Sequence, residues 1–397
     1  NAEFVKYSLE RVLDPDTQAP NKTRIAAIDH VDVVDEYTVN VVTQYPAPTL
    51  LQGMAEDGFC AMMVPVQHTS TSLETLGSEP VGTGPYMLKE WVKDDHITLV
   101  ANDAYWGTAP AIKTIIFRPI PETSTAISEL KSGGVDVITN VPPEQMDGLN
   151  TDTTKVVAKA TDRLFYINVN TLEEGPLQNK LVRQAIAYAI DVDAINESLL
   201  GGMAQRTAIN LPLEAFGYDA SLTPYEYNPE KAKELLAEAG YADGITIPFL
   251  SRNGRYIKDK EIVETCAAYL EQVGIHCEVE LVEGGVWQNR SENHGRKGIF
   301  YPGWSGRDAD LVFYPQLASG QSQSYVSDEA LDAMIMEART TMDEAKRLAL
   351  YYEIDAYLYD QMYQIPLFQS PAIYGVNNAL NWEPRNDDIL SFRDASF

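Results

Sequence analysis

From residue 82 onwards, segments with strand-like alternation of apolar residues take turns with segments of helical periodicity. Residues 164–170 predict a strand, and residues 181–200 then predict a helical segment. Residues 259–273 predict another helix, and the strand pattern of residues 275–281 follows it directly. Strands that alternate with helices in this way indicate an α/β protein built on mixed sheets.

The two ends of the chain carry other patterns. Residues 1 to about 78 open with an amphipathic helix that ends near Asp14, and residues 30–43 alternate as a hairpin does. Because the first residues already have the pattern of a helix interior, we expect that the sequence is cut from a longer precursor and lacks its targeting segment. Near the other end, residues 390–392 predict one short strand.

The chain carries 58 acidic and 30 basic residues, a formal net charge of −28 at pH 7. A field of this sign repels phosphate backbones and anionic lipid head groups, which argues against nucleic acid and membrane surfaces as partners. An acidic surface that keeps the protein soluble accounts for the charge. No run of about 18 apolar residues occurs, so we expect no membrane-spanning segment.

The cysteines do not indicate a metal site. Cys60, Cys266 and Cys277 form no CxxC motif and have no zinc-like spacing to a histidine. Cys266 falls on a predicted helix and Cys277 on the strand after it, so a bridge between them and two buried free thiols both stay open.

No catalytic constellation emerges either. Residues 303–307, Gly-Trp-Ser-Gly-Arg, come close to the GxSxG motif of hydrolases, but Arg occupies the last position and no helix clearly follows. The histidines are scattered without an HExxH motif, and only His294 stays as a candidate for metal contact. We therefore expect no enzyme, no metal and no cofactor, and keep a secreted hydrolase with Ser305 as nucleophile as an alternative.

Two short stretches far apart in the chain stand out instead, and the second of them carries recognition chemistry. Residues 80–86, Pro-Val-Gly-Thr-Gly-Pro-Tyr, predict a tight turn that enters a strand, and we interpret them as the place where one lobe joins another. Residues 303–310 combine an indole, a hydroxyl and charges of both signs, which suits a polar, amphiphilic ligand held in a cleft. Two arginines follow a predicted strand directly, where α/β sheets place their ligand loops. The candidate ligand-binding residues are Gly303, Trp304, Ser305, Arg307, Asp308, Arg252 and Arg255.

These motifs resemble those of a known family. Residues 80–86 with Trp91, and Tyr-Trp-Gly at 105–107, are similar to the PVGTGPY…EW…NPDYW stretch of family 5 extracellular solute-binding proteins. That family comprises the peptide, dipeptide and nickel receptors of ABC importers. Further motifs of the family follow in the same order at residues 129–136 (ELKSGGVD), 182–191 (VRQAIAYAID) and 227–240 (YNPEKAKELLAEAG).

The resemblance implies a periplasmic-binding-protein-like α/β fold of class II, in which two lobes with mixed sheets close over a ligand around a hinge. On the family pattern, residues 1–78 are the remnant of a small α+β domain. Residues 79–205 together with 372–397 form lobe I, and residues 206–371 form lobe II. The N-terminal portion of the family pattern, which includes its first strand, is absent from this sequence.

One departure from the family concerns the ligand. Peptide-binding members carry an Asp three residues after the Trp of the Gly-Trp loop, and it pairs with the α-amino group of the peptide. Arg307 occupies that position here, so either Asp308 takes over the amine contact or the ligand presents an anionic or neutral group. The resemblance also implies that Arg252 or Arg255 grips the ligand carboxylate, for which arginine geometry is suited.

The implied function is that of an extracytoplasmic receptor that captures an oligopeptide, dipeptide or related polar solute and delivers it to ABC permease subunits. Nickel-chelate, oligosaccharide and opine ligands stay open, as does a sensory or adhesive relative that serves no transporter. We expect a monomer located in the periplasm or lipid-anchored at the outer face of the cell membrane.

Overall fold

The computed structural model describes residues 1–17, 19, 22–55, 61–65, 75, 77–292 and 294–397. The chain divides into two units, and each is described by itself. Unit 1 consists of residues 1–138, 148–157 and 374–397, and unit 2 consists of residues 139–147 and 158–373. The division into a small domain and two lobes expected from the sequence stays a prediction.

Unit 1 begins with the helix and hairpin that the sequence predicts. Helix α1 (Ala2–Leu13) is capped by the Asn1 side chain, which accepts a hydrogen bond from the Phe4 backbone N–H. Strands β1 (Ile28–Asp35) and β2 (Thr38–Thr43) pair antiparallel, and α2 (Leu50–Ala55) follows them. One hydrophobic cluster of this part contains the buried residues Leu9, Val12, Ile25, Ile28 and Val31.

A three-stranded antiparallel sheet forms the next part of unit 1. Its order is β3 (Tyr86–Val92), β4 (His96–Ala101) and β5 (Thr114–Phe117). Helix α4 (Thr123–Ser132) ends at Gly133, whose positive φ of 78° suits glycine, and strand β6 (Val137–Ile138) comes after it.

The strand predicted at residues 390–392 is wrong. This segment is held by side chains instead: the Trp382 indole Nε1 donates to the Ser391 carbonyl at 2.8 Å, and the Trp382 ring stacks on Phe392. Apolar residues that bury themselves against a ring produce the same short pattern as a strand.

Two long strands, β7 (Thr154–Val169) and β13 (Gln364–Asn377), each run through both units. The sequence predicted only the last part of β7, from residue 164. Its first half contains Lys155 and Lys159 among its apolar residues, and this polar content obscures the strand pattern.

The sheet of unit 2 is mixed, as predicted. Its strand order is β10-β9-β11-β7-β13, with two short strands added at β7 and β13. Strands β9, β10 and β11 run parallel, whereas β7 is antiparallel to β11. The bounds are β8 (Gln205–Arg206), β9 (Ile245–Arg252), β10 (Ile275–Val282), β11 (Ile299–Tyr301) and β12 (Gly303–Trp304).

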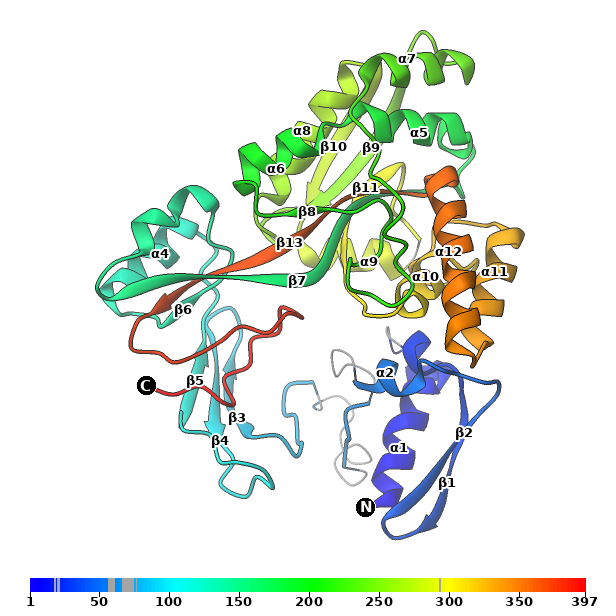
Figure 1. The fold of residues 1–397 in the computed structure, drawn as a ribbon. Coiled ribbons are helices and arrows are strands. Elements are labelled where there is room, and N and C mark those ends of the chain that lie inside the picture. The colour runs from blue at the N-terminus through cyan, green and yellow to red at the C-terminus, as the bar shows by residue number, and fades with distance from the viewer. Residues whose placement is uncertain (18, 20–21, 56–60, 66–74, 76, 293) are drawn as a thin grey trace. The chain divides into compact units, whose positions relative to one another are not determined.

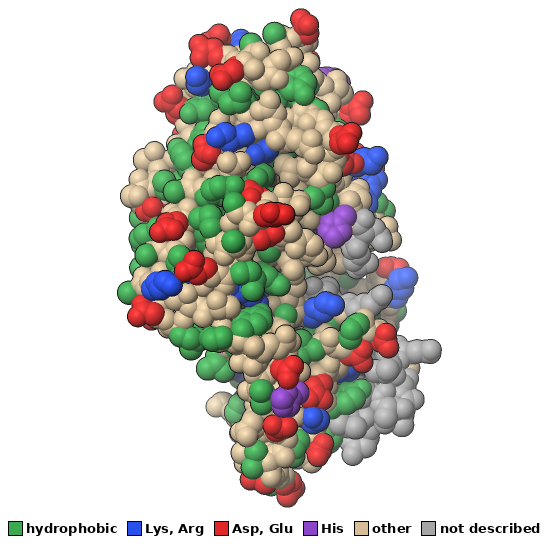
Figure 2. All heavy atoms as spheres, turned by 90° about the vertical axis from the view of Figure 1, so that its right-hand side faces the viewer, with side chains coloured by type: hydrophobic (Ala, Val, Ile, Leu, Met, Phe, Trp, Pro, Cys, Tyr) green, Lys and Arg blue, Asp and Glu red, His purple; other side chains and the backbone are tan. Residues whose placement is uncertain are grey.

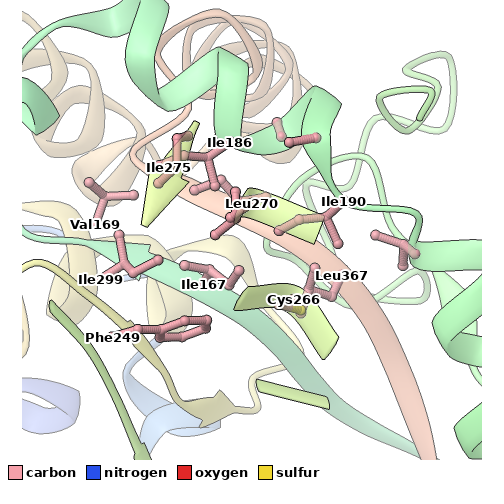
Figure 3. Close-up of a cluster of buried hydrophobic side chains, with 14 of the residues drawn as sticks. Ile167, Val169, Ile186, Ile190, Phe249, Cys266, Leu270, Ile275, Ile299 and Leu367 are labelled. Atoms are coloured by element: carbon pink, nitrogen blue, oxygen red, sulfur yellow. The ribbon is translucent and has the colours of Figure 1, made fainter. Parts of the chain in front are cut away.

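Helices α5 to α8 pack over one face of this sheet (Figure 1) and enclose its main core. Figure 3 shows the apolar side chains of this core, among them Ile167 of β7, Phe249 of β9 and Leu270 of α8. Cys266 lies in the same core, and both Cys266 and Cys277 are free thiols whose pKa values burial raises. Cys60 lies outside the described residues. The helices are α5 (Lys180–Ala189), α6 (Val192–Leu200), α7 (Pro229–Glu238) and α8 (Asp259–Glu271).

Four more helices complete unit 2. Three of them, α10 to α12, enclose a second core cluster that includes Phe313, Leu331 and Ile354. Trp287 of α9 packs with Phe300 and Tyr325 in a smaller cluster. The bounds are α9 (Gly284–Glu292), α10 (Ala309–Leu317), α11 (Glu329–Thr340) and α12 (Glu344–Gln361).

Figure 2 shows how the charged side chains are distributed on one face of the molecule. On the face in Figure 2, acidic side chains are scattered among apolar and basic ones rather than gathered into one patch. None of the helices in the described part of the chain is long and apolar enough to cross a membrane.

Candidate functional site

The loop that follows β9 is shaped by one buried carboxylate. Asp259, at the start of α8, is 3% exposed and accepts hydrogen bonds from the backbone N–H groups of Gly254, Arg255 and Tyr256 at 2.8–3.0 Å. Gly254 has a φ of 78°, which a residue with a Cβ adopts only with strain. These bonds fix the turn on which Arg255 and Tyr256 stand, directly after Arg252 at the end of β9.

Tyr256 is surrounded by guanidinium groups. The Cζ atoms of Arg252 and Arg255 lie 4.8 Å from its ring centroid, and that of Arg163 lies at 5.8 Å. Arg252 Nη2 also donates a hydrogen bond to the Tyr256 hydroxyl at 3.0 Å. Burial raises the pKa of Tyr256, but the three arginines lower it by more, so that the pKa lies below its usual value.

Two of these arginines are not neutralised inside the chain. Among the described residues, no carboxylate forms an ion pair with Arg252 or Arg255, and Arg255 is exposed. The sequence pointed to both arginines but missed Tyr256 and Arg163. Tyr256 could have been noticed as the aromatic residue in the same loop, whereas Arg163 comes from a strand far away in the chain.

The Gly-Trp loop lies beside Tyr256. Strand β12 pairs with β7 so that Gly303 faces Phe165. A Cβ added to Gly303 would lie 2.9 Å from the Tyr256 hydroxyl and 3.1 Å from Phe165 Cε1, so only glycine allows this close approach. Unit 2 therefore brings the two predicted recognition loops, residues 251–256 and 303–310, together at Tyr256.

The next residues of the Gly-Trp loop are partly exposed. Trp304 packs against the second core cluster and is half-buried, and its indole Nε1 donates to the Leu311 carbonyl at 3.4 Å. Ser305 is also half-buried. The Arg307 side chain is 50% exposed and forms an ion pair with Asp162, with Nε and Oδ2 3.2 Å apart. The charge that departs from the family pattern thus has a carboxylate partner within unit 2.

The two aspartates of the loop are held by arginines of unit 2. Asp308 caps α10 and receives two hydrogen bonds from Arg347, at 3.0 and 2.8 Å. Asp310 receives one from Arg339 at 2.6 Å, and all four side chains are less than 10% exposed. Burial lowers the pKa of Arg347, but its hydrogen bonds to Asp308 raise it by more. That Asp308 contacts a ligand stays a prediction.

Each described histidine has a polar partner close to it. His30, His96 and His276 each contact a nearby acidic side chain, and the ring of His294 lies 3.2 Å from the Gln321 carbonyl oxygen. No group of three or more potential metal ligands occurs in the part of the chain that the structure describes.

A comparison of the sequence with protein families gives a match over residues 1–325 to the bacterial extracellular solute-binding proteins, family 5. The chain belongs to this family. The resemblance noted in the sequence is therefore confirmed, and with it the prediction of a solute-binding protein.

Two curated relatives illustrate the family. The glutathione-binding protein GsiB of Pectobacterium atrosepticum is 29% identical over 365 residues, which cover 88% of this chain and 70% of that protein. GsiB of Salmonella typhimurium is 28% identical over 381 residues, covering 92% of this chain and 73% of its own. Both relatives are binding proteins by name rather than enzymes.

Solved structures confirm the periplasmic-binding-protein-like fold. The peptide complex of DppA from Helicobacter pylori has a TM-score of 0.87 at 23% identity, covering 96% of this chain and 78% of DppA. The agropinic acid complex of AgaA from Agrobacterium tumefaciens R10 has a TM-score of 0.86 at 24% identity, with the same two coverages. At these identities the likeness establishes the family 5 fold and leaves the ligand open.

Proposed function

We propose that this family 5 protein is the extracytoplasmic receptor of an ABC importer and that it captures a peptide-like solute at the site around Tyr256. The names of the relatives support peptide-like ligands, because GsiB is a glutathione-binding protein and DppA was solved with a peptide. The proposed partners are the solute and the ABC permease subunits, and we propose a monomer that is active outside the cytoplasm.

The observation that carries the proposal is the set of donors at Tyr256. Arg252 and Arg255 have no ion-pair partner among the described residues, and both guanidinium groups lie over the Tyr256 ring. The Tyr256 hydroxyl accepts a hydrogen bond from Arg252 and lies close to Gly303. A guanidinium offers two parallel N–H groups to a carboxylate, and such bonds are shorter and stronger than neutral ones. The ligand carboxylate therefore binds at Arg252 or Arg255.

The Gly-Trp loop supplies the remaining contacts. Trp304 offers an apolar face, Ser305 a hydroxyl and Gly303 its backbone groups. Arg307 or Asp308 takes a terminal charge of the solute. For Asp308 this contact requires that the carboxylate share or give up its bonds to Arg347. The half-exposed side chain of Arg307, which is paired with Asp162, supports Arg307 as the alternative.

We also propose that the protein is not an enzyme. The alternative, a hydrolase with Ser305 as nucleophile, requires that peptide or ester substrates are turned over and that Ser305→Ala abolishes this turnover. If the protein binds a ligand without turning it over, and Ser305→Ala binds it with the same affinity, the protein is a receptor and not a hydrolase.

Isothermal titration with glutathione, the dipeptide Met-Leu, agropinic acid and the nickel complex of L-histidine tests the ligand class. The last three are bound in solved structures that resemble this chain. We expect a peptide-like ligand to bind, and Arg255→Gln to weaken it at least tenfold, the cost of an unpaired charged hydrogen bond. Arg290→Gln is the matched control, because Arg290 is bonded to Glu280 at 2.6–2.7 Å. Tight binding of the opine or the nickel complex alone contradicts the peptide-like class.

A further inference from the structure

A third guanidinium without a carboxylate partner among the described residues belongs to Arg296, which shares an aromatic ring with Arg252. Arg296 lies between α9 and β11 and is 4% exposed. Its Cζ atom lies 4.2 Å from the Trp287 ring centroid and 5.1 Å from that of Phe300. Among the described residues it forms no ion pair, and its Nε has no hydrogen-bond partner.

Arg252 shares the same indole. Its Cζ atom is 4.7 Å from the Trp287 centroid, and its Nε is likewise buried without a hydrogen-bond partner. The two guanidinium groups interact with each other, and burial together with Arg252 lowers the pKa of Arg296 to about 10. Arg296 therefore stays protonated at neutral pH, so two like charges are held against one ring.

Stacking on aromatic rings satisfies only part of each guanidinium. A ring attracts the face of the group, by about 0.5–2 kcal/mol, whereas the N–H donors point outward in the plane of the group. In each group the Nε–H is buried without an acceptor, which is costly for a charged group, and a like charge nearby increases this cost. An anionic group bound at Arg252 removes the cost for both arginines at once.

We propose that the solute carries two anionic groups, one bound by Arg255 with Tyr256 and the second by Arg252, and that Arg296 is the residue that sets this preference. Arg252 is half exposed and contacts the ligand directly. Arg296 is buried, so it does not contact the ligand and acts on the anionic group only through its charge. This inference rests on the proposed function, because it names the class of solute for the same site.

A pair of probes isolates the second anionic group. Glutathione has two carboxylates, and its glycyl monoethyl ester has one. We expect the wild-type protein to bind glutathione more tightly than the ester, and Arg296→Gln to reduce this preference about tenfold, as expected for the loss of a nearby charge in a partly desolvated site. Arg296→Lys retains the charge and restores the preference.

Controls separate this effect from folding. Arg290→Gln on helix α9 removes an arginine that is already paired with Glu280, and it leaves the preference unchanged. If Arg296→Gln does not fold, as judged by far-UV circular dichroism, Arg252→Gln replaces it and lowers the preference in the same way.

The outcomes distinguish the two proposals. Binding of both probes with a preference that Arg296→Gln or Arg252→Gln leaves unchanged overturns the two-anion inference and leaves the peptide receptor standing. Equal binding of glutathione and its ester by the wild-type protein overturns it as well. Failure of the wild-type protein to bind either probe or any peptide overturns the proposed function and this inference with it.

Discussion

Asp308→Asn removes one charge from a buried ion pair while it keeps the size of the side chain. The side chains of Asp308 and Arg347 are 2% and 9% exposed, and two hydrogen bonds of 3.0 and 2.8 Å join them. Loss of one partner from such a pair leaves the other charge buried without compensation, which costs about 3–5 kcal/mol.

The lower end of that range applies here. Asn caps a helix about as well as Asp, so the N-cap of α10 is retained, and the amide oxygen still accepts one bond from Arg347. We expect the free energy of unfolding to fall by about 3 kcal/mol, measured by urea titration followed by far-UV circular dichroism. Glu280→Gln, which breaks a pair with a 56% exposed carboxylate, should cost less than about 1 kcal/mol.

A double variant tests the reason for this loss. In Asp308→Asn combined with Arg347→Met no unpaired charge remains, so the protein should be more stable than with Asp308→Asn alone. A loss below about 1 kcal/mol for Asp308→Asn, or a double variant that loses the sum of the two single losses, refutes the reasoning. Weakened glutathione binding at unchanged stability would instead make Asp308 the ligand contact that the sequence predicted.

Three further substitutions address the site and the pH dependence. Gly303→Ala places a Cβ 2.9 Å from the Tyr256 hydroxyl, so it should lower the affinity for glutathione and reduce the free energy of unfolding by about 1–3 kcal/mol. Gly284→Ala is the control, because a Cβ at that position meets no atom within 4 Å, and it should lower neither quantity. Tyr256→Phe removes the hydrogen bond that orients Arg252, worth about 1 kcal/mol or roughly fivefold in affinity by titration, and Tyr227→Phe serves as control. Burial raises the pKa of Asp355 in the folded protein well above its ordinary value of 3.8. The stability that this shift contributes is complete below pH 3.8 and is lost as the pH rises through the folded-state pKa. In urea titrations at increasing pH, Asp355→Asn should therefore become more stable relative to the wild-type protein. If the difference in free energy of unfolding between the two proteins does not change with pH, the raised pKa of Asp355 is contradicted.

Local patterns in the sequence were sufficient for many of the elements and for the α/β class. Asn228 and Pro229 start α7 as a cap and a first-turn proline do, and the break at Asp191 separates α5 from α6 because its side chain caps the second helix. The strand pattern failed where charges interrupt the apolar residues, as in the first half of β7, and where apolar residues pack against a ring, as at residues 390–392.

The site was predictable only in part, because its geometry depends on strand order. Arg252 ends β9, and Gly303 follows β11, which is the parallel neighbour of β9, so the two loops leave the sheet at the same edge. Local sequence patterns do not reveal this neighbourhood, although the family resemblance implied that both loops contact the ligand. Asp162 and Arg163 were not predicted at all, because they lie on β7, far from both loops in the sequence. The ion pair between Asp162 and Arg307 spans 145 positions of the chain. The sequence therefore showed Arg307 as a free charge, whereas the structure gives it a partner.

The charge of the whole chain and the charge of the site act over different distances. A net charge of −28 disfavours the approach of an anion, but at physiological salt this repulsion is screened beyond about 8 Å. Inside the site, Arg252, Arg255 and Arg296 have no carboxylate partner among the described residues, and buried charges interact more strongly because solvent screens them less. The acidic surface therefore acts on solubility and the rate of encounter, whereas in the proposed function the arginines around Tyr256 and Trp287 select which solute stays bound.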